Sequence, residues 1–199
     1  MKNLPQILLQ NLIEVAEIRV PKIDKHEIDK ETRAEKFTLK FADDEQIECV
    51  LIPNPKGMTL CVSSQIGCAL DCKFCKTASM GIRRNLTAGE IYSQFLAARE
   101  NTNAPVTNIV FMGMGEPMLN YDNVLTAMRI MKDDLGYGIG KKRITLSTSG
   151  HIPRMDQLSQ DLDVSLAVSL HAPNDELRNE LVPLNRKYPL KELMAACKR

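Results

Sequence analysis

The sequence lacks any apolar run that approaches the roughly 20 residues of a membrane-spanning helix. No secretory signal is expected either, because Gln10, Asn11 and Glu14 interrupt the leucine-rich start and no small-residue cleavage site follows. Positive and negative side chains nearly balance, since the formal net charge is +1. We therefore expect no membrane partner, and any nucleic-acid-binding surface must be local.

The cysteines lack the spread of a disulfide framework. Three of the six lie within eight residues, which favours a reducing compartment, by default the cytoplasm, and a metal site. With 199 residues, of which 44% are hydrophobic and 26% charged, the chain can bury one sizeable core. We expect one main domain with some N-terminal decoration.

The first 57 residues predict a helix and a hairpin. Apolar residues at helical spacing predict an N-terminal helix over residues 4–18. A polar, charged connector follows over about residues 21–35. Residues 36–52 then form two β-rich runs around the turn Ala42-Asp43-Asp44-Glu45, which predicts a β-hairpin.

From about residue 58 the pattern alternates strand and helix four times. The predicted strands are MTLCVSS, VTNIVFM, RITLS and VSLAVSL. A capping box from Thr87 to Glu90 opens the first helix, Gly136 ends the second, and the last begins near Pro189. Four βα units in series imply an α/β fold with parallel strands. Because ligands bind at the carboxyl ends of such strands, the four loops that follow them should gather on one face.

The loop after the first of these strands has the spacing Cys-x3-Cys-x2-Cys at Cys68, Cys72 and Cys75. Cysteine thiolates hold iron–sulfur clusters, and three ligands on a four-iron cluster leave one iron open for a small molecule. Two plainer alternatives are structural zinc, which needs four closed ligands, and buried free cysteines. The loop contains no histidine and no fourth cysteine, and it is polar. The spacing therefore favours a [4Fe-4S] cluster.

Polar residues stand at the other three strand ends. In GMGEP the glycines permit close backbone approach, and Glu116 can accept hydrogen bonds from a ligand ammonium group. Ser147 and the run Ser169-Leu170-His171 can contact a ribose or a carboxylate. The alternatives are an ordinary glycine-rich turn, local backbone capping by the serines and a structural hydrogen bond from the histidine.

The runs TLCVSSQIGCALDCKFCKTASMGIRRNLT, FMGMGEPMLNYDNV, LSTSG and SLHAPND closely resemble the RlmN/Cfr family of radical S-adenosylmethionine (SAM) RNA methyltransferases. The resemblance begins at about residue 12. It implies a partial (βα) barrel with about four of six βα units, preceded by the hairpin and helix. It also implies a [4Fe-4S] cluster and SAM as cofactors. The implied reaction is methylation of adenine C2 in 23S rRNA and tRNA through a methyl-cysteine intermediate.

The resemblance assigns roles to individual residues. Cys68, Cys72 and Cys75 match the cluster ligands. Glu48 matches the proton-accepting base, and Cys61 matches the resolving cysteine, which forms a disulfide with the methyl-carrying cysteine to release the product. Without the resemblance, Glu48 would be interpreted as a solvated strand residue and Cys61 as a buried thiol. The positions that match SAM-binding residues are Gly115, Glu116, Ser147, Ser169, Leu170 and His171.

The chain departs from the family pattern at its C-terminal end. The methyl-carrying cysteine belongs to a later part of the family pattern, and Cys197, on a predicted helix, is not its counterpart. We therefore expect residues 1–20 to be the remnant helix of an accessory domain, residues 21–57 a connector and hairpin, and residues 58–199 an incomplete radical SAM core. The chain alone should not methylate RNA.

The implied partners are RNA and an electron donor such as flavodoxin or ferredoxin, and the chain is expected to be a monomer. Two other functions stay open at this point. One is methylation of adenine C8, as in the antibiotic-resistance relative. The other is a non-catalytic iron–sulfur or zinc-binding protein. No role is assigned to Cys49 or Cys197.

Overall fold

The computed structural model describes residues 5–199, so the start of the predicted N-terminal helix lies outside the described residues. Seven strands form one mixed sheet in the order β1-β2-β3-β4-β7-β8-β9, and β5 and β6 form a separate antiparallel pair. The strands are β1 (Lys22–Ile28), β2 (Glu35–Lys40), β3 (Gln46–Asn54), β4 (Gly57–Cys61), β5 (Gln65–Gly67), β6 (Ile82–Asn85), β7 (Val106–Phe111), β8 (Ile144–Thr148) and β9 (Ser165–Val168).

Within residues 5–199, six α-helices and four short 3-10 helices accompany these strands. The α-helices are α1 (Gln6–Val15), α2 (Ala88–Glu100), α3 (Tyr121–Lys132), α4 (Ile152–Asp161), α5 (Asp175–Leu181) and α6 (Leu190–Lys198). The 3-10 helices are η1 (Ala78–Met80), η2 (Pro117–Asn120), η3 (Lys141–Arg143) and η4 (Pro183–Arg186).

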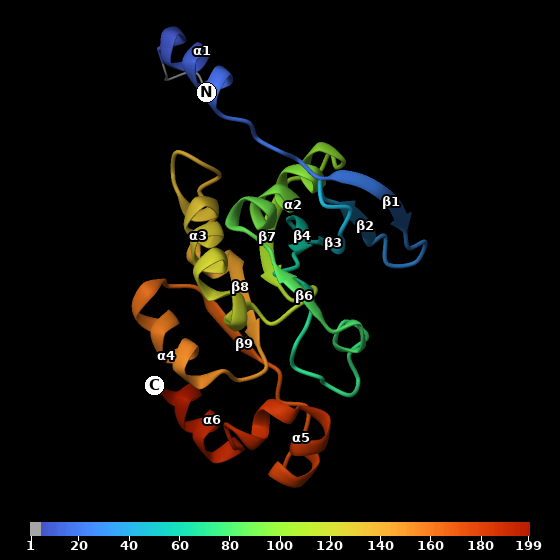
Figure 1. Ribbon diagram of the computed structural model, residues 1–199, viewed down its shortest axis with the longest axis vertical. Coiled ribbons are helices and arrows are strands. Elements are labelled where there is room, and N and C mark those ends of the chain that lie inside the picture. Colours follow the sequence, from blue (N-terminus) through green and yellow to red (C-terminus); the bar gives the residue numbers. More distant parts are fainter. Residues whose placement is uncertain (1–4) are drawn as a thin grey trace.

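The predicted α/β class is confirmed by strands β4, β7, β8 and β9, which pair in parallel. A helix follows each of them, and Figure 1 shows α3 and α4 side by side with β7, β8 and β9. Alternate residues face the helices, as in β8, where Ile144 and Leu146 are buried while Thr145 and Ser147 are half-buried. The carboxyl ends of all four strands therefore lie at one edge of the sheet.

The predicted hairpin is confirmed as β2 and β3, which pair antiparallel. It continues the main sheet because β3 also pairs with β4, and it supplies buried residues such as Phe37, Ile47 and Leu51 to the common core. The connector predicted before it is wrong in one respect. Residues 22–28 form β1, an edge strand whose side chains are almost all exposed, so no apolar alternation marks it in the sequence.

The predicted helix boundaries can be compared with the structure. The last helix begins at Leu190, as predicted near Pro189, whereas the first ends at Val15 and not at residue 18. The capping box at the start of α2 is present, since Thr87 accepts from the Glu90 N–H and the Glu90 side chain accepts from the Thr87 N–H. The end predicted for α3, at Leu135 before Gly136, is wrong. The helix ends at Lys132 because Asp133 turns to an extended conformation.

Helix α1 stands apart from the rest of the molecule at the end of an extended segment (Figure 1). None of its residues is buried, and its apolar residues Ile7, Ile13 and Val15 are largely exposed. No helix within residues 5–199 has the length and apolar character to cross a membrane.

Candidate functional site

A cavity of about 300 Å³ lies at the carboxyl ends of the parallel strands. Its walls come from the cysteine loop, the GMGEP loop and the ends of β8 and β9, so the four loops gather on one face as predicted. The predicted site residues that line it are Cys68, Cys72, Cys75, Gly115, Glu116, Ser147, Ser169 and His171. Leu170, Glu48 and Cys61 lie outside this lining.

The three cysteines of the loop differ in exposure. Cys68 and Cys72 are buried, whereas Cys75 is half-buried. Burial raises the pKa of Cys68, and it raises the pKa of Cys72 to about 11. The metal-free protein therefore favours neutral thiols, and iron must displace their protons when it binds. All six cysteines are free, so the predicted disulfide is not formed in this structure.

Buried amide side chains anchor both ends of the cysteine loop. Gln94 of α2 accepts from the Ser63 N–H and donates to the Ser63 carbonyl, each at 2.8 Å. Asn120 donates to the carbonyls of Ser64 and Leu86, both at 2.7 Å. Since Ser64 precedes the loop and Leu86 follows it, one amide group closes the base of the loop.

Glu116 is buried beside the cavity, with 3% of its surface exposed. The Met118 N–H donates to one carboxylate oxygen at 3.1 Å, and the Ser149 N–H donates to the other at 2.8 Å. Burial raises the pKa of Glu116, and the hydrogen bond from Ser149 opposes that rise. A buried, oriented carboxylate is stabilised by a cation, so its place suits a ligand ammonium group.

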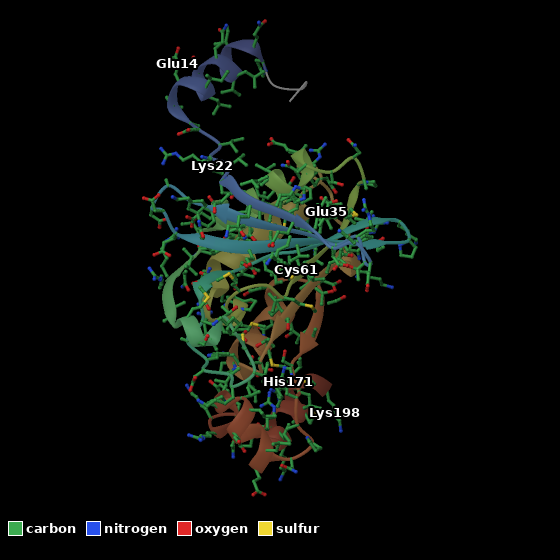
Figure 2. The ribbon with its side chains drawn as sticks, turned by 90° about the vertical axis from the view of Figure 1, so that its right-hand side faces the viewer. Glu14, Lys22, Glu35, Cys61, His171 and Lys198 are labelled. Atoms are coloured by element: carbon green, nitrogen blue, oxygen red, sulfur yellow. The ribbon has the colours of Figure 1, made fainter. Side chains whose placement is uncertain are left out.

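The loop after β9 contacts the cysteine loop through aromatic rings. His171 adopts a left-handed conformation with φ 59°, and its ring lies 4.2 Å from the Phe74 ring at an angle of 43°. Phe74 directly precedes Cys75, so this contact joins the two loops. The Ser169 N–H donates to the Thr148 carbonyl at 2.9 Å and joins the ends of β8 and β9. Figure 2 shows His171 between the sheet and the C-terminal helices.

Glu48 and Cys61 lie on neighbouring strands. Cys61 pairs with Val50, and Glu48, two residues from Val50, faces the same side of the sheet. The Glu48 side chain is half exposed, and its carboxylate lies 3.2 Å from the Lys36 ammonium group. The Ser63 hydroxyl donates to the Glu48 carbonyl at 2.6 Å. The structure thus brings these two residues onto one face, apart from the cavity lining.

Sequence reasoning missed Arg178 of α5, which is buried beneath the cavity loops with 1% of its surface exposed. In the sequence it stands in the run DELRNEL, whose alternating charges are typical of a solvated helix. No signal in the sequence marked it as a buried residue.

The sequence profile of the radical SAM superfamily matches residues 62–199. This chain belongs to the radical SAM superfamily. The dual-specificity RNA methyltransferase RlmN of Alcanivorax borkumensis is 61% identical over the whole chain, and that of Marinobacter nauticus is 53% identical. The resemblance found in the sequence is thereby confirmed. The chain spans about half the length of these curated relatives, 54% and 55% respectively.

A solved radical SAM methyltransferase from Sphaerobacter thermophilus has the same fold, with a TM-score of 0.90 and 44% sequence identity. The match covers all of this chain and 59% of that protein. The predicted partial barrel of the radical SAM type is therefore confirmed.

The radical SAM cofactors are a [4Fe-4S] cluster and SAM, and the residues at the cavity fit both. Three cysteine thiols and a buried carboxylate open onto one space. Among residues 5–199, no three histidine, cysteine or acidic side chains are arranged around a single metal ion. The ligands of a four-iron cluster bind different irons, so their sulfur atoms do not converge on one point.

Proposed function

We propose that this chain is the cofactor-binding part of an RNA methyltransferase that acts on adenine C2 in 23S rRNA and tRNA. The observation that carries the proposal is the convergence of three cysteines and Glu116 on one cavity at the strand ends. The RlmN relatives, named as dual-specificity RNA methyltransferases, support the choice of RNA as substrate.

In this proposal Cys68, Cys72 and Cys75 hold the cluster. SAM is bound by Gly115, Glu116, Ser147, Ser169, Leu170 and His171. When bound, the cluster and SAM supply the radical chemistry that an unactivated aromatic carbon requires. Glu116 accepts hydrogen bonds from the SAM ammonium group. Two backbone N–H groups already hold its carboxylate in a fixed orientation.

Glu48 and Cys61 act on the methylated base rather than on SAM. Glu48 takes the ring proton. Cys61 attacks the sulfur of the methyl-carrying cysteine, so that the new S–S bond forms as the sulfur–carbon bond to the base breaks. The transferred carbon keeps the electrons of that bond and takes up a proton. Their shared face on β3 and β4 supports a common substrate position. The exposed carboxylate of Glu48, beside Lys36, also suits a group that exchanges a proton with a large substrate.

The further partners are part of the same proposal. Reductive SAM cleavage needs an electron, for which we propose a flavodoxin or ferredoxin as donor. We also propose that the protein is a monomer in the cytoplasm. The chain by itself should cleave SAM without methylating RNA, because the proposed methyl-carrying cysteine is not among its residues. In a version extended to the length of the relatives, mass analysis of the methylated nucleoside separates C2 from C8.

Anaerobic reconstitution with iron and sulfide tests the proposal on this chain. We expect a brown protein with about four irons per chain that cleaves SAM under a strong reductant. Cys72→Ser should lose iron and SAM cleavage, whereas Cys197→Ser, a change at an exposed cysteine of α6, should retain both. A colourless protein that holds one zinc ion would contradict the proposal.

A further inference from the structure

Arg178 donates four hydrogen bonds from a fully buried guanidinium group. Its Nε donates to the Leu170 carbonyl at 2.9 Å, and its Nη1 donates to the Asn185 side chain at 2.7 Å. Its Nη2 donates to the carbonyls of Ser149 at 2.7 Å and Ser169 at 3.1 Å. Three of the four acceptors are therefore backbone carbonyls of the loops that follow β8 and β9.

These loops form two walls of the cavity. Ser169 lines the cavity itself, and Ser149 donates its N–H to Glu116. Arg178 thus reaches the Glu116 carboxylate of the cavity through one intermediate residue, Ser149.

Helix α5 is tied to the cysteine loop as well. The Lys73 N–H, next to Cys72, donates to the Leu181 carbonyl at the end of α5 at 3.1 Å. The helix that carries Arg178 therefore holds three separate walls of the cavity: the β8 loop, the β9 loop and the cysteine loop.

The charge of Arg178 has no direct counterion among the residues that the structure describes. Its only side-chain acceptor is the amide of Asn185, which in turn donates to the Asp175 carboxylate at 2.8 Å. A buried cation without a paired anion costs stability. Asp175 is reached only through Asn185, and a second source of negative charge arises in the cavity when its cysteines become thiolates on binding iron.

We propose that Arg178 is a positioning residue of the cofactor cavity, which fixes the loops after β8 and β9 and places a permanent positive charge beside the cysteine loop. The inference rests on the proposed cofactor function. The reduction potential of an iron–sulfur cluster depends on net charge and hydrogen bonds around it. A nearby cation stabilises the reduced, more negative state, so its removal lowers the potential.

The loop-fixing role is tested in the metal-free chain by hydrogen–deuterium exchange. In Arg178→Lys and Arg178→Gln, the amides of residues 147–151 and 168–173 should exchange at least about tenfold faster than in the wild type, because several charge-assisted hydrogen bonds are lost. Arg186→Gln removes the same charge from an exposed neighbouring position and should exchange like the wild type. Unchanged exchange in both Arg178 variants would overturn the role.

The charge role is tested after reconstitution by redox titration and by SAM binding. Arg178→Gln should have a lower midpoint potential, whereas Arg178→Lys, which keeps the charge, should stay near the wild type. Both variants should bind SAM at least about tenfold more weakly. Equal potentials in all three proteins would overturn the electrostatic part.

The outcomes separate this inference from the proposed function. A wild-type chain that assembles no cluster contradicts the proposed function, while hydrogen exchange still decides whether Arg178 fixes the loops. Loss of the far-UV circular dichroism signal in both variants would also overturn the inference, since Arg178 would then determine the fold as a whole rather than the cavity.

Discussion

Gly115 passes so close to Gln65 that a Cβ atom at this position would lie 2.5 Å from the Gln65 Cβ and 2.9 Å from its backbone nitrogen. Its φ of 94° is one that other residues rarely adopt. The close approach sets the position of the next residue, Glu116, whose N–H donates to the Gln65 side chain at 2.8 Å. The requirement for glycine here is therefore one of backbone geometry.

Gly115→Ala should destabilise the metal-free chain by about 3 kcal/mol, because both the strained φ and the contact with a backbone atom must be relieved. Urea unfolding measures the change. Gly140→Ala is the matched control, since no atom lies within 4 Å of the added methyl group and its φ of −62° is ordinary. Equal unfolding midpoints for the two variants would show that the loop adapts.

Glu116→Gln should weaken SAM binding by about ten- to a hundredfold at pH 8, because an ammonium group loses its charged acceptor. Burial raises the pKa of Glu116, so this side chain ionises at a higher pH than an ordinary glutamate. The affinity of the wild type should therefore fall with decreasing pH, and the difference from the variant should shrink. Isothermal titration over a pH series measures both.

The same raised pKa has a consequence for the stability of the metal-free protein. A group whose folded pKa is raised stabilises the fold below its unfolded pKa, and this contribution is lost as the pH rises through the folded pKa.

The control for the binding experiment is Glu176→Gln, at an exposed position of α5, which should change neither the SAM affinity nor its pH dependence. A wild-type affinity that is constant over the pH series would contradict the assigned role of Glu116.

At the scale of elements, one carboxylate at the start of helix α2 accepts hydrogen bonds from two residues. Glu90 accepts from the Thr87 N–H at 2.8 Å, and its two oxygens accept from the Arg84 guanidinium group at 2.9 and 2.8 Å. Burial raises the pKa of Glu90, but the bonds from Arg84 and Thr87 outweigh it and the net pKa is lowered. The start of the helix and the end of β6 are thereby linked.

Glu90→Gln should cost about 1 kcal/mol of stability at pH 7, because the charged acceptor at the helix N-terminus is lost. A lowered carboxyl pKa gives stability that is present above the unfolded pKa and lost as the pH falls through the folded pKa. The difference between wild type and variant should therefore vanish in acid. Denaturation at pH 7 and pH 3 measures it, with the exposed Glu100→Gln at the far end of α2 as control.

The elements that the sequence predicted are those with a local signal. The capping box of α2 and the apolar strands β7 and β8 carry such signals in a few consecutive residues. Strand β1 is held by backbone pairing to β2 and buries almost no side chain, so its composition resembles a connector. The pair β5 and β6 is too short for a periodic pattern.

At the scale of the molecule, the sequence predicted which residues meet but not what holds them. Parallel topology brings strand ends together by rule, so the cysteines, Glu116 and His171 could be placed on one face. The residues that support them bond to backbone carbonyls far along the chain. Asn120 reaches Ser64 across 56 positions, and Arg178 reaches Ser149 across 29. A backbone carbonyl has no residue identity, so no sequence pattern could reveal these pairs.

The proposed division is into residues 1–20, 21–57 and 58–199. Its two N-terminal parts should contribute differently to the stability of the core. Helix α1 buries no residue, so removal of residues 1–16 should leave the melting temperature within about 2 °C of the wild type. Phe37 of the hairpin is fully buried in the common core, and Phe37→Ala should cost about 3 to 4 kcal/mol.

The hairpin should unfold with the barrel in one transition, because β3 and β4 share backbone hydrogen bonds and one core. Phe74→Ala is the matched control, since this ring is 53% exposed and its loss should shift melting of the metal-free protein far less. Calorimetry of all three proteins measures the transitions. A separate low-temperature transition in Phe37→Ala alone would mean that the boundary at residue 57 divides two cooperative units. A single shifted transition would mean that only α1 is independent of the core.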